Sequence, residues 1–185
     1  MARSKCCWSG WHAPAVTDSG AQPLRYTSGM EPVDLILWRH ADAVDGYPDA
    51  ERALTAKGER DARRMAKWLN GKLPDDALIL VSPAQRAQQT ASALQRPFTT
   101  VAAIGTSAEP VDILQAAQWP RAAHPTLIVG HQPTLGGVVS LLLTGAADDL
   151  SVKKGAVYWI TGRKRGAGNG QVQSVLRVMM APDML

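Results

Sequence analysis

Short apolar runs alternate with amphipathic helical patterns from residue 33 onward, and this alternation most constrains the fold. Three runs have the length and branched composition of buried strands, at residues 33–38, 77–81 and 126–129. Strands that alternate with helices pair in parallel, because each crossover helix returns the chain to the same edge of the sheet. We therefore predict an α/β fold of three layers, α/β/α, with a mostly parallel central sheet.

The expected helices begin and end at recognisable residues. Thr55 precedes a helical stripe of apolar residues that Gly71 ends. The run Ser82-Pro83-Ala84-Gln85 predicts a capping box, with Ser82 as the cap and Pro83 at the first helical position. We also expect helices over residues 110–117 and from Pro133 to Gly145, and two final strands over 156–161 and 172–178.

Residues 1–29 show neither helical nor strand periodicity, and we expect an irregular N-terminal extension there. Our hypothesis is that Met30 is the natural start, with residues 30–185 forming one domain, as a length of 185 residues suggests. The two cysteines, Cys6 and Cys7, are adjacent and cannot join distant parts of a fold. A metal site with His12 lacks enough ligands. We expect a reducing, cytoplasmic compartment.

The net charge of +4 suits an anionic partner but does not by itself indicate nucleic acid. The basic run Arg163-Lys164-Arg165 lacks interleaved aromatic residues, so a solvated loop is expected rather than a nucleic-acid surface. Residues 166–170 are rich in glycine but lie between two strand-like runs, which favours a hairpin loop over a phosphate loop. The sequence contains no run of 18 apolar residues, so it predicts no membrane-spanning helix.

Polar residues follow three of the expected strands at the points where they end. Arg39 and His40 end the first strand, Arg86 lies in the helix after the second, and His131 follows the third. Ligands of open α/β sheets bind beyond the carboxyl ends of the strands. We therefore expect these four side chains to meet, and two guanidiniums with two imidazoles form an anion site.

Each of these residues also has a structural interpretation when taken alone. Arg39 could be a solvated charge, and His40 a histidine bonded to the backbone. His131 could shape a turn, and Arg86 could extend over its own helix. Four separate structural explanations at one end of one sheet are less economical than one site.

Four segments, in this order, resemble the histidine phosphatase superfamily, which is also called phosphoglycerate mutase-like. Within it they are most similar to the small SixA-like phosphohistidine phosphatases, and the resemblance runs from Val33 to the C-terminus. The segments are Leu37-Trp38-Arg39-His40-Ala41-Asp42-Ala43, Leu54-Thr55-Ala56-Lys57-Gly58, residues 82–90 and Val129-Gly130-His131-Gln132-Pro133.

The resemblance implies that His40 is a nucleophile that takes up a phosphoryl group. It also implies that Arg39 and Arg86 hold the phosphate oxygens, that His131 completes the pocket, and that no metal or other cofactor takes part. Physical chemistry agrees, since charge in phosphoryl transfer spreads over the equatorial oxygens and positive donors stabilise it. A phosphorylated protein or a small phosphorylated molecule is the expected partner, not nucleic acid or a membrane.

The sequence departs from the family in two places. Ala41 stands where most members have glycine, and no residue matches the proton-donating acid of the family. Weak candidates for that acid are Asp42, Asp45, Glu109 and Asp112.

The missing acid bears on the substrate. A departing imidazole of pKa ~6.5 does not need the proton that an alkoxide needs. Only 36 residues, 91–126, separate the second and third motifs, too few for a helical lid. Both features favour phosphohistidine in a protein. A phosphatase or mutase for a small phosphate ester, and a phosphate-binding module without catalysis, stay open as alternatives.

Overall fold

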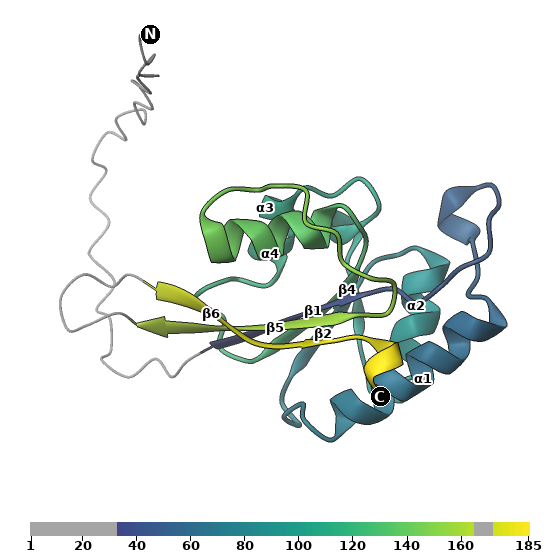
Figure 1. Ribbon diagram of the computed structural model, residues 1–185, viewed down its shortest axis with the longest axis horizontal. Coiled ribbons are helices and arrows are strands. Elements are labelled where there is room, and N and C mark those ends of the chain that lie inside the picture. Colours follow the sequence, from purple (N-terminus) through teal and green to yellow (C-terminus); the bar gives the residue numbers. More distant parts are fainter. Residues whose placement is uncertain (1–32, 165–171) are drawn as a thin grey trace, which may run out of the picture. The chain divides into compact units, whose positions relative to one another are not determined.

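The computed structural model describes residues 33–164 and 172–185 (Figure 1). The expected irregular extension over residues 1–29, with Cys6, Cys7 and His12, lies outside these residues, and so does the glycine-rich stretch 166–170.

The described strands form one six-stranded sheet in the order β3-β2-β4-β1-β5-β6. Strands β1 to β4 pair in parallel, whereas β5 runs antiparallel to both of its neighbours, β1 and β6. This arrangement confirms the mostly parallel sheet. The strands are β1 (Val33–Arg39), β2 (Leu78–Val81), β3 (Thr99–Thr100), β4 (Thr126–Gly130), β5 (Val157–Lys164) and β6 (Val172–Met180).

Helices cover both faces of the sheet, which confirms the three-layer α/β/α architecture. Figure 1 shows α3 and α4 on one face and α1 and α2 on the other. The α-helices are α1 (Ala56–Asn70), α2 (Gln85–Ser92), α3 (Pro110–Ala116) and α4 (Thr134–Thr144), and the short 3₁₀ helices are η1 (Asp49–Glu51), η2 (Ala102–Ile104) and η3 (Pro182–Met184). Among the helices of the described residues, none is long and apolar enough to cross a membrane.

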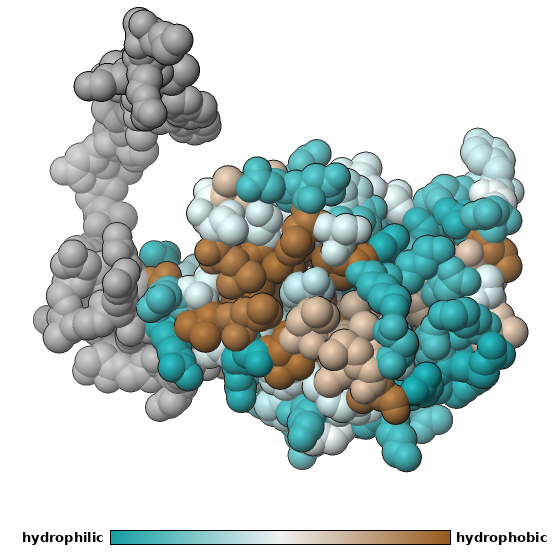
Figure 2. Space-filling model, in the orientation of Figure 1, coloured by the Kyte–Doolittle hydropathy of each residue, from teal (hydrophilic) through white to brown (hydrophobic). Residues whose placement is uncertain are grey.

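The two largest hydrophobic clusters of the described residues lie on opposite faces of the sheet, and β1 contributes to both. Ile36 and Trp38 lie in the cluster on the α1 side, while Leu35 and Leu37 lie in the cluster on the α4 side. This alternation follows from the period of two along a strand. Figure 2 shows apolar residues gathered between α4 and the β5–β6 pair, and hydrophilic residues over α1.

The beginning of α1 lies very close to the chain that follows His40. Thr55 caps the helix as predicted, since its hydroxyl accepts from the Gly58 N–H at 2.9 Å. The same residue binds the segment after β1, with its N–H donating to the Asp42 carbonyl at 3.0 Å. A Cβ on Gly58 would lie 1.9 Å from that carbonyl oxygen, so only glycine allows this approach.

The capping box predicted for the next helix is wrong. Helix α2 begins at Gln85, and Ala84 rather than Ser82 is at the cap position. The Ser82 hydroxyl accepts from the Ala84 N–H at 3.3 Å and also lies 2.6 Å from a ring nitrogen of His131. Ser82 therefore belongs to a turn that contacts the third strand end, and it does not cap α2.

Candidate active site

The strand register brings the three predicted strand ends together. Arg39 pairs with Gly130 across β1 and β4, and Val81 pairs with Val129 across β2 and β4. The residues that directly follow these strands therefore lie side by side. The His40 N–H donates to the Gly130 carbonyl at 3.0 Å. The imidazole rings of His40 and His131 lie with centroids 5.2 Å apart.

His40 is buried, with its two ring nitrogens in different surroundings. Nδ1 lies 2.7 Å from the Ala41 carbonyl oxygen, so this nitrogen carries the proton and donates it. Nε2 accepts from the Nε–H of Arg86 at 3.3 Å, and its lone pair therefore faces the guanidinium. Burial lowers the pKa of His40 to about 4, and the charges of Arg86 and Arg39 lower it further against the effect of the Ala41 carbonyl. The imidazole is therefore neutral at neutral pH.

Arg86 reaches His40 from the first turn of α2, and its exposed fraction is only 5%. The tip of its guanidinium is held by Asp49 of η1. Nη1 donates to the Asp49 main-chain carbonyl at 2.6 Å, and Nη2 donates to the Asp49 carboxylate at 2.9 Å. This ion pair lowers the pKa of Asp49, so its carboxylate is ionised at neutral pH.

Arg39 ends β1 and has one buried nitrogen without a partner. Its Nη1 donates to the Val152 carbonyl at 2.5 Å, while the buried Nε has no hydrogen-bond partner among the described residues. A buried donor without an acceptor is costly, and such groups are rare unless a ligand satisfies them. Arg39 therefore has an N–H at the end of β1 that is able to donate to an anion.

His131 is buried too, and its Nε2 is paired with the Ser82 hydroxyl. Because the Ser82 hydroxyl accepts from the Ala84 N–H, its own hydrogen can go to Nε2 of His131, 2.6 Å away. Nδ1 then carries the ring proton, and this buried nitrogen has no partner in the described part of the chain. Burial lowers the pKa of His131 to about 3, helped by the positions of His40 and Arg86.

Three of the four candidate acids have partners away from His40. Asp42 accepts from Lys154 at 2.6 Å and from the Thr55 hydroxyl at 2.9 Å, and Lys154 lowers its pKa. Asp45 pairs with Arg52. Asp112 accepts from the Glu109 N–H at the start of α3, and Glu109 is itself the remaining candidate. None of the four carboxyl groups contacts His40 in the described part of the chain.

Sequence reasoning misses Asp49, and it finds Ser82 among the polar residues at the strand ends without its bond to His131. Asp49 lies in a segment without periodicity, where no pattern distinguishes it from Asp45. Ser82 has the pattern of a helix cap, and the same short hydroxyl group serves either purpose. No group of three His, Cys, Asp or Glu side chains that could hold a metal ion occurs in residues 33–164 and 172–185.

Comparison with protein families gives a match over the part of the chain that carries His40 and Arg86. The model described as histidine phosphatase superfamily (branch 1) matches residues 35–107. An uncharacterised protein of Picosynechococcus sp. is 31% identical over 155 residues, which cover 77% of this chain and 91% of that protein. The phosphohistidine phosphatase SixA of Escherichia coli is 41% identical over 59 residues, which cover 31% of this chain and 37% of SixA. The matched region is thus well under half of SixA.

Comparison with solved structures agrees on the fold. A structure assigned as a phosphohistidine phosphatase SixA from Nakamurella multipartitia has a TM-score of 0.67 with this chain, at 26% sequence identity. The two structures align over 83% of this chain and 98% of the other. The likeness therefore includes both helical layers and the sheet between them, and not the strand ends alone.

Proposed function

Because this chain belongs to the histidine phosphatase superfamily, we propose that it is a phosphatase that works through a covalent phosphohistidine at His40. The observation that carries the proposal is the state of His40, a neutral imidazole whose Nε2 lone pair lies beside the Arg86 guanidinium. We further propose that it needs no metal ion and that its preferred substrate is phosphohistidine in another protein.

In the first step, the Arg86 Nε–H moves its hydrogen bond from Nε2 of His40 to a phosphoryl oxygen. The freed lone pair of Nε2 bonds to phosphorus while the phosphorus–nitrogen bond of the substrate breaks. The electron pair of that bond leaves with the substrate imidazole, which departs as a neutral ring because it holds a proton on its other nitrogen. The His40 ring becomes positively charged when Nε2 bonds to phosphorus. The Ala41 carbonyl, which accepts from Nδ1–H, stabilises that charge.

In the second step, a water oxygen bonds to phosphorus and the bond to Nε2 breaks. The electron pair returns to Nε2, which restores the neutral imidazole, and the water hydrogens leave on the inorganic phosphate and exchange with solvent. His40 is therefore ready for another cycle without a further proton transfer at Nδ1.

The charge that develops on the phosphoryl oxygens is met by donors that stand ready before the substrate binds. Arg39 Nε and His131 Nδ1 are buried and unpartnered within the described residues, and Arg86 Nε, which is bonded to His40 in the free protein, turns to a phosphoryl oxygen. Donors that need no reorganisation account for most of the catalysis in reactions of this type. The lowered pKa of His131 means that it donates as a neutral ring until a phosphate dianion raises its basicity.

The carboxylates near the site favour a phosphorus–nitrogen substrate. The pKa of Asp42 is lowered by Lys154, and that of Asp49 by Arg86, so both are ionised at neutral pH and hold no proton to donate. A phosphate ester of an alcohol needs such a proton at its leaving oxygen, whereas an imidazole of pKa ~6.5 leaves without it.

A substrate comparison tests the proposal. We expect kcat/KM to be highest with a histidine-phosphorylated protein, and far lower with phosphoserine, a sugar phosphate and p-nitrophenyl phosphate. Much higher kcat/KM with phosphoserine or the sugar phosphate would instead assign the protein to small phosphate esters. Binding of phosphate or vanadate without any turnover would show a phosphate-binding module.

A further inference from the structure

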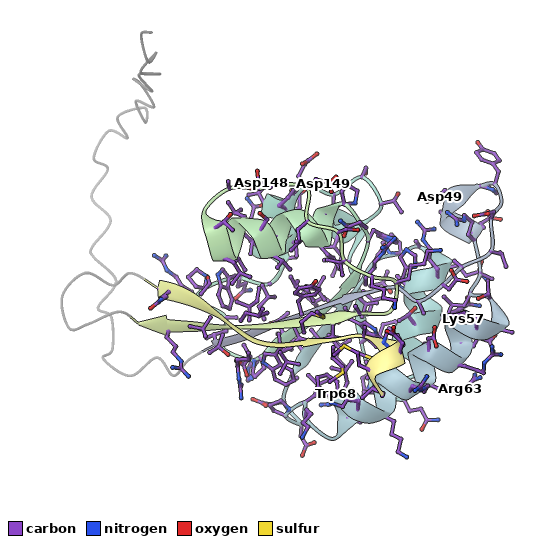
Figure 3. The ribbon with its side chains drawn as sticks, in the orientation of Figure 1. Asp49, Lys57, Arg63, Trp68, Asp148 and Asp149 are labelled. Carbon is purple, nitrogen blue, oxygen red and sulfur yellow. The ribbon has the colours of Figure 1, made fainter. Side chains whose placement is uncertain are left out.

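A short exposed segment, residues 44–51, delivers Asp49 to the guanidinium of Arg86. Every residue of this segment is exposed, and it includes η1 (Figure 1). Figure 3 labels Asp49 there, at the start of η1. Arg86 by contrast is buried, so a residue of the molecular surface holds a buried residue of the proposed active site.

Arg52 holds the segment in its conformation. Its Nε donates to the Val44 carbonyl at 2.7 Å, and its two terminal nitrogens donate to Asp49 at 3.0 Å and Asp45 at 3.1 Å. The Asp49 carboxylate therefore lies between two guanidiniums, with Oδ1 on Arg52 and Oδ2 on Arg86. Its orientation is determined on both sides.

We propose that Asp49 is a positioning residue for phosphoryl transfer, which clamps the tip of Arg86 so that the Arg86 Nε–H stays within reach of a phosphoryl group bound at Nε2 of His40. The inference rests on the proposed function, because the value of that N–H is its contact with the phosphoryl group on His40. Asp49 itself does not touch the reacting atoms and acts through Arg86.

The pattern of donors distinguishes a clamp from a competing anion. A guanidinium has five N–H hydrogens, and Arg86 uses one at each of its three nitrogens for His40 and for the two oxygens of Asp49. Two hydrogens stay available for phosphate oxygens while Asp49 is in place. One of the two Asp49 oxygens is its main-chain carbonyl, which cannot rotate away as a side chain can. Asp49 thus supports Arg86 during binding and does not have to leave first.

Three variants test this inference, with Asp45 as the matched control. Asp45 lies in the same segment and pairs with the same Arg52, but among the described contacts it does not pair with Arg86. We expect Asp49→Ala to lower kcat by roughly 10- to 100-fold with little change in KM, as misplacing a catalytic group does. Vanadate, which mimics the trigonal transition state, is expected to bind more weakly by a similar factor. Asp45→Ala is expected to stay within about twofold of the wild type.

Asp49→Asn separates positioning from a general structural effect. Its amide oxygen can accept from Arg86 and its main-chain carbonyl is unchanged, so we expect most of the lost kcat to return. The melting temperature of each variant, read by circular dichroism, shows that the compared proteins are equally folded at the assay temperature.

Two results would overturn the inference. Equal kcat and equal vanadate affinity in Asp49→Ala and Asp45→Ala would show that Arg86 needs no clamp. Tighter vanadate or phosphate binding with faster turnover in Asp49→Ala would show that Asp49 competes with the substrate. Vanadate affinity depends on the placement of Arg86 and can be measured without turnover. If the wild-type protein shows no phosphatase activity, the proposed function is contradicted, but the vanadate measurement still tests the role of Asp49.

Discussion

The two histidines of the site are neighbours, but their hydrogen bonds give them different roles. His40 presents a lone pair at Nε2, whereas His131 presents a donor at Nδ1. We expect His40→Ala to abolish turnover and the acid-labile, base-stable ³²P label, because the atom that bonds phosphorus is gone. In His131→Ala a labelled enzyme should still form, roughly 10²–10³ times more slowly, since one stabilising donor is lost.

The contrary outcomes are equally specific. Near-normal turnover in His40→Ala would rule out the covalent mechanism. So would loss of wild-type activity in EDTA that a divalent metal restores, because the arginines and His131 would then not be what neutralises the phosphate. We expect EDTA to leave kcat unchanged in the wild type.

Ser82 offers a second test at the scale of one residue. Ser82→Ala removes the hydroxyl that bonds Nε2 of His131, so the ring loses the group that keeps its proton on Nδ1. We expect turnover to fall by about 10-fold or more, as for loss of a group that orients a catalytic imidazole. Ser92→Ala is the control, because Ser92 bonds only the Gln88 carbonyl of its own helix in the described contacts. Equal turnover in the two variants would contradict the role of Ser82.

Ser82 and Asp49 also show where residue-level prediction stops. The positions of Arg39, His40, Arg86 and His131 near strand ends are enough to place them at one edge of the sheet. A serine followed by proline is a helix-start pattern, and nothing local distinguishes it from a serine that bonds a histidine 49 positions away. Asp49 is found only when the path of residues 44–51 in space is known.

At the scale of elements, the contact of α1 with the chain after His40 depends on the absence of a side chain at Gly58. Gly58→Ala would place a Cβ 1.9 Å from the Asp42 carbonyl, so the helix or the Asp42 segment must move. We expect the free energy of unfolding to fall by about 1–3 kcal/mol, the usual cost of overpacking, and turnover to fall with it. Denaturant unfolding measures the change in the free energy of unfolding.

Gly71→Ala is the matched control at the other end of the same helix. A Cβ there would lie 3.6 Å from the nearest atom, an ordinary contact. A Gly58→Ala variant as stable as Gly71→Ala would show that the close approach to Asp42 is not required.

The elements themselves are largely predictable, and their starts less so. Apolar periodicity predicts the bounds of α1 and α4 to within a residue, because each has a buried stripe and a clear stop at Gly71 or Gly145. The two-residue strand β3 has exposed side chains and leaves no pattern in the sequence. The predicted start of α2 is two residues early, because the Ser82 hydroxyl bonds His131 instead of capping the helix.

At the scale of the whole molecule, the two buried histidines link stability to pH. Burial lowers the pKa of His40 to about 4 and that of His131 to about 3, whereas both titrate near 6.5 when the chain is unfolded. Between pH 6.5 and 4 the unfolded chain therefore binds protons that the folded protein does not. Their contribution to stability is complete above pH 6.5 and is lost as the pH falls, by up to roughly 1.4 kcal/mol per pH unit for each histidine.

Thermal unfolding at pH 7, 6 and 5 measures this dependence. We expect a lower melting temperature at each step down, and a shallower decline in His131→Asn than in the wild type. His124→Gln, at an exposed position paired with Asp76, serves as the control that keeps the wild-type decline. An identical decline in all three proteins would contradict the link.

The order of strands lies beyond local prediction. The sequence indicates a mostly parallel sheet, but not that β1 lies between β4 and β5, since any buried strand can pair with several others. The resemblance to a known family supplies the topology that periodicity alone cannot.

The central place of β1 has a consequence for how the protein is made. β1 is the earliest strand in the described chain and begins at Val33, yet its two neighbours are β4, which begins at Thr126, and β5, which begins at Val157. A nascent chain therefore carries His40 through the synthesis of the next 91 residues without His131 beside it, and pairings between segments so distant form slowly. Translation stopped before residue 130 would release a chain that holds the proposed nucleophile but lacks the rest of the proposed phosphate site, so we expect premature termination to yield an inert product and not a partly active enzyme.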